Sequence, residues 1–147
     1  MYAAVDFETT AILPRPEYPP VPVGVAILVE GREPEYLAWG HPGKNNCERD
    51  FAIGRLAALW YKPEYRLIFH NAAFDLDVAE THLGLKMPPW QRFHDTQVMA
   101  FLVDPEHHTT RLKEIAAEYL GMAPEEQEDL FAWIRQHVPE ARRKKNV

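Results

Sequence analysis

The sequence predicts a mixed α/β fold, with one layer of strands and helices packed on it. Three observations support this class. Three short segments typical of strands come first, helical and strand patterns then alternate, and helical patterns alone fill the C-terminal part. That order of elements is typical of layered α/β domains. A chain of 147 residues can bury one sizeable core, so we expect a single domain over residues 1–147.

Three strands are predicted in the N-terminal part of the chain. The first covers residues 3–5 and is followed by five prolines within residues 14–22. This segment can be neither a helix nor a central strand, so it is predicted as an extended loop, either a stiff connector or a substrate-facing loop. Further strands are predicted over 23–29 and 35–39, with a turn at Gly31, which makes an antiparallel meander.

Helices and strands then alternate. A helix with an apolar face that includes Phe51 is predicted to start at Asp50 as its N-cap and to end before Pro63. A brief apolar strand covers 66–69. A helix over 73–82 follows, and the glycine two residues after it is expected to close it.

The last predicted elements are a short strand over 92–95 and three helices. The first helix covers 96–102. The second has Thr110 as its N-cap, a strict helical spacing of apolar residues, and Gly121 at its end. The third starts at Pro124, with acids in its first half and basic residues in its last, the order that the helix dipole favours.

Composition excludes several classes of protein. No apolar run approaches the length of a membrane span, and no signal-peptide pattern precedes the first strand, so we expect a cytoplasmic protein without membrane contact. Cys47 is the only cysteine, which excludes an internal disulfide and fits a reducing compartment. The net charge of −6 argues against broad wrapping of a nucleic acid, but not against a small contact made through bound cations.

Two carboxylates end the first predicted strand. Asp6 and Glu8 are two residues apart, so in a strand they share one face while Phe7 points to the other. Two negative charges so close repel each other unless a cation lies between them, and Mg²⁺ or Mn²⁺ prefers such hard oxygen donors. The pattern therefore indicates either a metal site or two solvated acids before a polar turn.

A second polar corner joins the strand over 66–69 to the next helix. Asp75 falls in the first helical turn, where the helix dipole stabilises an anion. Asn71 is positioned to cap the helix and to hold a carboxylate. An ordinary acid and an ordinary cap are the alternative. Asp77 points elsewhere on the helix, and we expect it to be solvated.

Two further features are interpreted as structural rather than catalytic. Asp95 or Thr96 is predicted to cap the helix over 96–102. The adjacent pair His107 and His108 has the composition of a metal site. However, neighbouring side chains diverge on any regular element and no third ligand is near in the sequence, so we predict a loop there.

Taken in order, these motifs resemble those of the DEDD, or DnaQ-like, 3′–5′ exonuclease superfamily, above all the proofreading domains of phage and bacterial family A DNA polymerases. The matching segments are Asp6-Phe7-Glu8-Thr9-Thr10, Asn71-Ala72-Ala73-Phe74-Asp75, His94-Asp95-Thr96 and Leu112-Lys113-Glu114-Ile115-Ala116. The resemblance implies an RNase H-like fold, a mixed five-stranded sheet flanked by helices, with carboxylates over its centre. Four linked motifs are far more specific than any one of them.

The resemblance also implies roles for individual residues. Asp6, Glu8 and Asp75 would be the catalytic ligands of two Mg²⁺ or Mn²⁺ ions; Phe7, Thr9, Asn71 and Phe74 would bind substrate; and Asp95 would be structural support. The implied reaction is hydrolysis of the terminal phosphodiester at the 3′ end of single-stranded DNA, with RNA as the alternative substrate. The implied setting is proofreading in DNA replication, with a DNA polymerase domain fused C-terminally or acting in trans.

One family motif is absent. The family has a late Tyr-x-x-x-Asp or His-x-x-x-x-Asp, but Ala123 stands four places after Tyr119 and Arg142 five places after His137, and no aspartate follows Asp129. We therefore expect that the C-terminal part of the fold is missing, as in a truncated fragment. We also expect weak or no activity, because the final metal ligand would be lost.

Two other classes of function stay open. One is a degenerate, non-catalytic module of the same fold that binds nucleic acid or protein. The other is an aspartyl-phosphate phosphatase, because Asp-x-Glu-x-Thr resembles the Asp-x-Asp-x-Thr of those enzymes. Against the phosphatase, Glu8 is one methylene longer than the aspartate of that motif, and no lysine follows in a matching strand.

Overall fold

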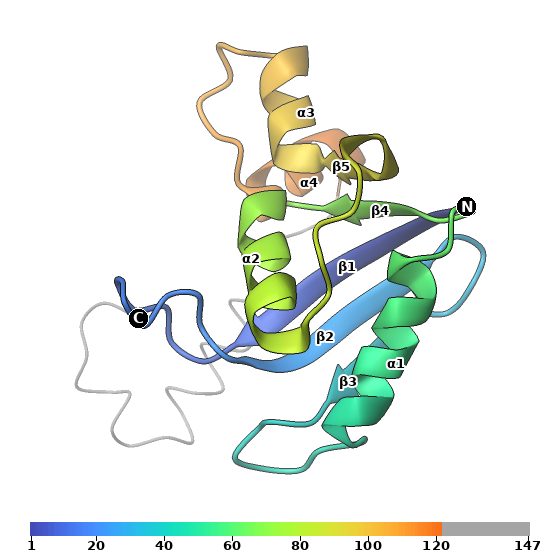
Figure 1. Ribbon diagram of the computed structural model, residues 1–147. Coiled ribbons are helices and arrows are strands. Elements are labelled where there is room, and N and C mark those ends of the chain that lie inside the picture. Colours follow the sequence, from blue (N-terminus) through green and yellow to red (C-terminus); the bar gives the residue numbers. More distant parts are fainter. Residues whose placement is uncertain (122–147) are drawn as a thin grey trace. The chain divides into compact units, whose positions relative to one another are not determined.

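The computed structural model of the protein describes residues 1–121, in which five strands form one mixed sheet in the order β3-β2-β1-β4-β5 (Figure 1). The strands are β1 (Tyr2–Thr9), β2 (Pro22–Val29), β3 (Glu35–Ala38), β4 (Arg66–Phe69) and β5 (Phe93–Asp95). The helices are α1 (Arg49–Trp60), α2 (Ala72–Leu83), the 3₁₀ turn η1 (Trp90–Arg92), α3 (Thr96–Val103) and α4 (Leu112–Leu120). The predicted mixed five-stranded α/β architecture is confirmed.

Strand β1 is the centre of the sheet. It pairs antiparallel with β2, which pairs antiparallel with β3, so the predicted meander is confirmed. On its other side β1 pairs in parallel with β4, and β4 pairs in parallel with β5. The carboxyl ends of β1, β4 and β5 therefore meet at one edge of the sheet, and α2 begins just after β4 at that edge.

Helices α1 and α2 lie on the same face of the sheet (Figure 1). Alternate residues of β1, among them Ala3, Val5 and Phe7, point to this face and are buried there. Trp60 at the end of α1 is buried against the aromatic ring of Phe69, and its indole N–H donates a 2.8 Å hydrogen bond to the carbonyl of Lys86. Burial of this apolar layer is the main source of stability of this unit.

Helix starts differ from the sequence-based expectation. α1 begins at Arg49, and Asp50 lies in its first turn rather than at the N-cap, where it still faces the positive end of the helix dipole. The core stripe of α1 is Ala52, Leu56, Leu59 and Trp60. Phe51, predicted on the core face, is 59% exposed. Ala52 is small and can approach the sheet more closely than a phenylalanine. Position 52, rather than position 51, therefore faces the core.

The start of α4 is also corrected. Thr110 is not its N-cap, because the helix begins at Leu112 after Arg111. The backbone N–H of Arg111 donates instead to the hydroxyl of Thr109, at 3.1 Å. Helix ends agree better with expectation, since Gly84 closes α2 and Gly121 closes α4, both in the left-handed conformation that glycine adopts without strain.

The chain divides into two compact units, one from Met1 to Val103 and the other from Asp104 onward. The first unit contains the sheet with α1, α2 and α3, and the described part of the second contains α4. In the described range, no helix combines the length and the apolar character needed to cross a bilayer. The helix predicted from Pro124 lies outside the described residues.

Candidate active site

Asp6 and Glu8 lie side by side on the sheet face opposite α1 and α2. Both are exposed, and β-pairing places Asp6 opposite Ala26 and Glu8 opposite Gly24. The pairing of β1 with β2 shifts just after Glu8, where the strand ends. The prediction that the two carboxylates share one face is confirmed. Ala26 is small, whereas the space above Gly24 is occupied by the ring of Tyr36.

Asp75 brings a third carboxylate to the same strand. Its side chain is only 2% exposed, and its Oδ1 accepts a 3.1 Å hydrogen bond from the backbone N–H of Phe7, the residue between Asp6 and Glu8. The pairing of β4 with β1 covers only Tyr2–Ala4, so the backbone beyond it is open to another acceptor. The first turn of α2 supplies that acceptor.

The environment of Asp75 is unfavourable for a negative charge. Burial raises its pKa to about 7, the nearby charges of Asp6 and Asp95 raise it as well, and the hydrogen bond from Phe7 acts in the opposite direction. The pKa of Asp6 is also raised, chiefly by partial burial, while the positive charge of His70 lowers it. Carboxyl groups with raised pKa values are often found at functional sites.

Asp95 fixes the position of both helices that begin at this edge. Its carboxylate accepts backbone N–H groups from the start of α2, Asn71 at 3.0 Å and Ala72 at 2.8 Å. It also accepts those of Gln97 at 2.9 Å and Val98 at 3.4 Å, in the first turn of α3. One side chain therefore caps two helices, which is the support role that the sequence suggested for it.

Asn71 does not cap α2 through its side chain, contrary to expectation. It stands at the N-cap in the left-handed conformation, with φ 68° and ψ 58°, and makes no side-chain capping bond. Asparagine tolerates this conformation better than most residues do. Because Asp95 already accepts the N–H groups of the helix start, the amide of Asn71 is not needed for them.

His70 directly follows β4, and its side chain contacts the first residue of α3. Its Nδ1 lies 2.9 Å from the hydroxyl of Thr96, and that hydroxyl donates to the carbonyl of Phe69 at 3.0 Å. A threonine hydroxyl has a single hydrogen, so Nδ1 is the donor of the first bond. Sequence reasoning assigned no role to His70.

The metal site is only partly formed by these residues. Among residues 1–121, no three His, Cys, Asp or Glu side chains lie close enough together to hold an ion. The donor set nevertheless suits a hard cation, because a divalent ion would stabilise the charged forms of Asp6 and Asp75, which their surroundings disfavour. We therefore take Asp6, Glu8 and Asp75 as the residues that would hold it.

The expected substrate contacts are not equally placed. Phe7 is 5% exposed and packs in the core below the sheet, so its side chain cannot reach a substrate; this expectation is corrected. It contributes its backbone N–H instead. Thr9 is half-buried, with its hydroxyl donating to the carbonyl of Thr10, and Phe74 packs partly against the core. Asn71 is exposed at the edge.

Two tyrosines near the carboxylates were not found from the sequence. Burial, then Asp77 and finally Asp75 raise the pKa of Tyr18, which lies in the proline-rich loop. Tyr36 crosses β2 above Gly24, where a Cβ atom would lie 2.5 Å from its hydroxyl, and that hydroxyl lies 2.6 Å from His41 Nε2. Both depend on loop and hairpin geometry, which residue spacing does not encode.

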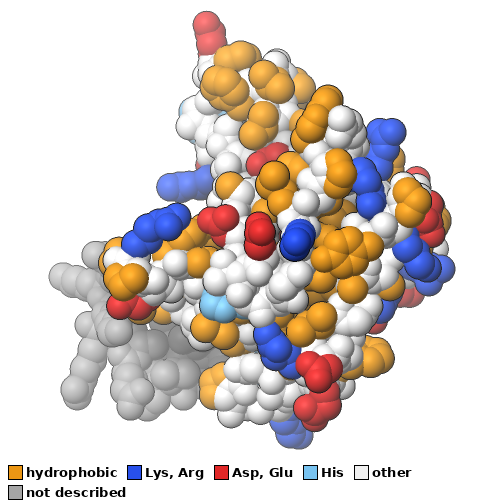
Figure 2. Space-filling view, in the orientation of Figure 1, with side chains coloured by type: hydrophobic (Ala, Val, Ile, Leu, Met, Phe, Trp, Pro, Cys, Tyr) orange, Lys and Arg blue, Asp and Glu red, His pale blue; other side chains and the backbone are white. Residues whose placement is uncertain are grey.

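Charges on the helical face are mixed. Figure 2 shows acidic and basic side chains interspersed over α1 and α2, with no broad patch of one sign in that view of the described residues. The face seen in this view therefore offers no broad basic patch to a polyanion.

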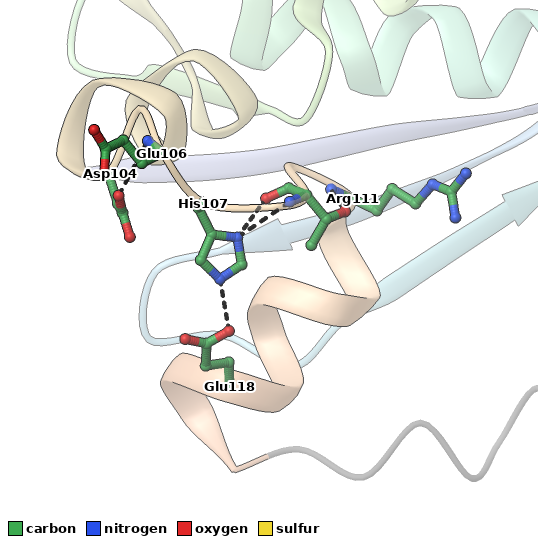
Figure 3. Close-up of polar contacts among 6 residues, drawn as sticks. Asp104, Glu106, His107, Arg111 and Glu118 are labelled. Carbon is green, nitrogen blue, oxygen red and sulfur yellow. Dashed lines mark hydrogen bonds and ion pairs between the residues drawn. The ribbon is translucent and has the colours of Figure 1, made fainter.

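The pair of histidines lies in a loop, as predicted, but the two rings do not diverge. Their centroids are 4.5 Å apart, because an irregular segment does not impose the alternation of a strand. His107 Nδ1 lies 2.7 Å from the carbonyl of Thr109, and its Nε2 lies 2.7 Å from a carboxylate oxygen of Glu118 in α4 (Figure 3). The carbonyl and the carboxylate are acceptors and favour the doubly protonated ring, whereas the longer 3.3 Å contact from the backbone N–H of Thr109 to Nδ1 acts against it. These contacts explain the histidine as a structural residue of the second unit.

His107 is therefore expected to stabilise α4 in a pH-dependent way. The carbonyl of Thr109, Glu118 and the charge of Asp104 raise the pKa of His107 above its ordinary 6.5. The stabilisation is complete below pH 6.5 and is lost as the pH rises through the raised pKa of the folded state. An NMR titration of the imidazole should show that Glu118→Gln lowers this pKa. The exposed Glu114→Gln is the control, and an equal drop in both variants would contradict the assignment.

Comparison with known proteins gives a consistent result. The family model described as 3′–5′ exonuclease matches residues 2–143. A DNA polymerase of Escherichia phage T5 is 29% identical over 122 residues, which are 81% of this chain and 13% of that protein. The chain thus spans about an eighth of the length of this curated relative.

Solved structures share the fold. Brucella melitensis NrnC with bound Mg²⁺ has a TM-score of 0.63 at 22% identity, covering 83% of this chain and 54% of that one. Escherichia coli RNase D, an exoribonuclease involved in structured RNA processing, has a TM-score of 0.60 at 20% identity, covering 82% of this chain and 28% of that one. At these identities the likeness shows the fold alone.

Proposed function

The chain belongs to the 3′–5′ exonuclease family, and from that premise we propose that it hydrolyses the terminal phosphodiester at the 3′ end of single-stranded DNA. The main support for the proposal is the hydrogen bond that Asp75 accepts from the backbone N–H of Phe7. It brings a carboxylate from α2 to the strand end that already carries Asp6 and Glu8, and it joins segments 68 residues apart.

Each protein group has a defined part in this proposal. Asp6, Glu8 and Asp75 would hold Mg²⁺ or Mn²⁺, which when bound polarises the phosphodiester and lowers the pKa of an attacking water. Asp6 and Glu8 are exposed and so admit a phosphate, whereas Asp75 is buried and fixed in place. Asp95 positions the start of α2, and so keeps Asp75 against β1.

The choice of DNA rests on the phage T5 DNA polymerase, which is 29% identical to this chain over 122 residues. On the same ground we propose a proofreading setting, with a polymerase domain in the same chain or in a partner. RNA is the alternative substrate, because RNase D shares the fold. A common fold does not by itself decide between the two.

A non-catalytic binding module is the second candidate. It is favoured by the lack of a complete three-ligand cluster among residues 1–121. The two candidates differ in one measurable property, since only the enzyme releases mononucleotides.

The test is release of mononucleotides from a 20-nucleotide single strand, blocked at its 5′ end, with Mg²⁺, Mn²⁺ or EDTA. We expect slow release, because the sequence lacks the late aspartate motif of the family. This release should need the metal and should fall further in Asp6→Ala, by up to about 100-fold, because a carboxylate that would hold the metal is removed. The matched control is Glu33→Ala, an exposed acid in the β2–β3 turn. Calorimetric titration with Mn²⁺ is expected to show weaker binding in Asp6→Ala.

Each outcome of this test has a defined meaning. Equal release by the wild type and Asp6→Ala, or release in EDTA, would contradict the proposed mechanism. Mn²⁺ and oligonucleotide binding without any release would support the non-catalytic module. A faster release from a single-stranded RNA of the same sequence would reverse the choice of substrate.

A further inference from the structure

Tyr36 lies on the sheet face that carries the candidate active site. In the pairing of β3 with β2 it stands opposite Ala26, and in the pairing of β2 with β1 Ala26 stands opposite Asp6. Residues that are paired in neighbouring strands point to the same face of a sheet. The side chain of Tyr36 is therefore on the same face as Asp6 and Glu8, from which β2 separates it.

The ring of Tyr36 reaches over β2 toward Glu8. A Cβ atom at Gly24 would lie 2.5 Å from the hydroxyl oxygen of Tyr36 and 2.9 Å from the ring carbon that carries it, so the glycine leaves room for the end of the ring. Gly24 is the residue paired with Glu8, and paired Cβ positions are about 5 Å apart. The hydroxyl end of Tyr36 is thus within about one side-chain length of Glu8. Burial and then the charge of Glu8 raise the pKa of Tyr36, in agreement with this placement.

His41 holds the hydroxyl end of the ring. Its Nε2 lies 2.6 Å from the hydroxyl oxygen of Tyr36, and the centroids of the two rings are 6.1 Å apart. Asn45 holds His41 in turn. Its side-chain oxygen accepts the backbone N–H of His41 at 3.0 Å, and its amide donates to the carbonyl of the same residue at 3.3 Å. These contacts restrict the orientations that the tyrosine ring can adopt.

Asn46 fixes the same loop to the edge strand β3. Its side-chain oxygen accepts the backbone N–H of Ala38 at 2.8 Å, and its amide donates to the carbonyl of Tyr36 at 2.7 Å. Tyr36 is therefore held at both ends, with its backbone bonded to Asn46 and its hydroxyl to His41.

A fixed and exposed aromatic ring suits a nucleic-acid base. Tyr36 is 42% exposed although its hydroxyl is bonded, so part of the ring surface is open to a ligand. Bases of single-stranded nucleic acids stack on aromatic side chains with little sequence preference. A ring that is already held in place loses little conformational freedom when a base stacks on it. If Asp6 and Glu8 hold the cation that binds the terminal phosphodiester, the attached base is the part of the substrate nearest to the ring.

We propose that the ring of Tyr36 stacks on the base of the 3′-terminal nucleotide, with His41 and Asn45 as positioning residues. The inference rests on the proposed function, and it adds a base-binding group to the carboxylates. Stacking does not read the edges of a base, so we expect all four bases to be accepted.

The test measures binding apart from cleavage. A 5′-fluorescein-labelled dT₅ strand is titrated with the full chain in Ca²⁺ and followed by anisotropy, beside a strand that lacks only its 3′-terminal base. We expect the wild type to bind dT₅ about fivefold more tightly than the abasic strand, at the low end of what one stacked base contributes. Tyr36→Val removes the ring and keeps a residue that favours strands. It should bind the abasic strand like the wild type and gain less than twofold from the base.

Further variants test the positioning role of His41. His41→Ala and Tyr36→Phe each remove the bond to the hydroxyl and keep the ring, so both should gain only about twofold from the base. The double variant should be no weaker than either. His41→Gln, whose amide can bond to the hydroxyl, should restore most of the gain.

The matched control is Tyr2→Val. Tyr2 is 44% exposed and lies on the same sheet face as Tyr36, at the other end of β1 from Glu8. It should leave the gain from the terminal base unchanged. Circular dichroism checks that each variant is folded.

The outcomes separate this inference from the proposed function. An equal gain from the terminal base in the wild type and Tyr36→Val would overturn the inference, even if Asp6→Ala abolishes nucleotide release. Equal weakening of both strands in Tyr36→Val would also overturn it, because it would indicate a role in the hairpin alone. So would failure of the wild type to bind dT₅. A gain that depends on Tyr36, in a protein that releases no nucleotide in any metal, would support the inference while the proposed hydrolysis fails.

Discussion

Asp75→Asn is expected to raise the free energy of unfolding of the metal-free protein at pH 8 by up to ~4 kcal/mol. The pKa of Asp75 is about 7 in the folded protein against 3.8 for an ordinary aspartate, mainly because it is buried. Asparagine has nearly the same shape and carries no charge to bury. Its Oδ1 can still accept the N–H of Phe7.

The sign follows from the direction of this shift. Between pH 4 and pH 7 the folded state keeps a proton that the unfolded state has lost, so the stability of the wild type falls as the pH rises through this range. Above pH 7 it stays at the lower level. Asp75→Asn does not lose stability in this range. The difference in free energy of unfolding between the two proteins therefore appears above pH 4 and reaches its full size near pH 8.

Urea unfolding in EDTA at pH 5 and pH 8 measures the effect. The control is Asp50→Asn, an exposed acid in the first turn of α1, for which a change of only a few tenths of a kcal/mol is expected. Added Mn²⁺ should stabilise the wild type more than Asp75→Asn, because it stabilises the charged carboxylate. Equal destabilisation of Asp75→Asn at both pH values would refute this account of the site.

The same residue shows how function and stability oppose each other here. A neutral side chain would suit its buried position, yet the aspartate stands at the strand end where the other two carboxylates lie. Lower stability caused by a buried charged group is common in proteins where that group is needed for binding or catalysis. This is an independent physical argument that Asp75 serves a function.

Much of the fold could be predicted because it depends on local patterns. The alternation in β1 places Asp6 and Glu8 on one face whatever the rest of the chain does. Gly84 and Gly121 end helices because they adopt the left-handed conformation without strain. Helix starts were predicted less well, because a cap can be supplied by a residue distant in sequence, as Asp95 does for α2.

The remaining parts of the site depend on tertiary register. The burial of Asp75 depends on β4 ending before it reaches the level of Phe7, which no spacing in the sequence shows. The contact of Tyr18 with α2 depends on the path of the loop between Thr9 and Pro22. Sequence motifs could therefore suggest candidate carboxylates, but not the residues that surround them.

Asp95→Ala is expected to lower the free energy of unfolding by ~3 kcal/mol, the second large effect. The carboxylate accepts four backbone N–H groups, two at the start of α2 and two in the first turn of α3. Loss of a single N-cap side chain typically destabilises by about 1 kcal/mol, and here two helices lose their cap. Water can replace the bonds of the exposed N–H groups, but less readily that of the buried Ala72.

Asp95→Asn separates the two halves of this effect. Oδ1 accepts the N–H groups of Asn71, Gln97 and Val98, whereas Oδ2 accepts only that of Ala72. The amide can keep the first set and must lose the last, so we expect about half the destabilisation of Asp95→Ala. Hydrogen exchange should show the loss at Ala72 in both variants, and at Gln97 only in Asp95→Ala.

Asp104→Ala is the matched control, because this aspartate accepts one backbone N–H, that of Glu106, in an exposed turn. It should change the stability by less than ~1 kcal/mol. Since α2 carries Asp75, the Asp95 variants should also weaken Mn²⁺ binding in the order Ala more than Asn, although Asp95 is not proposed as a metal ligand. If Asp95→Ala lost stability but kept full Mn²⁺ affinity, the start of α2 would not be what positions Asp75.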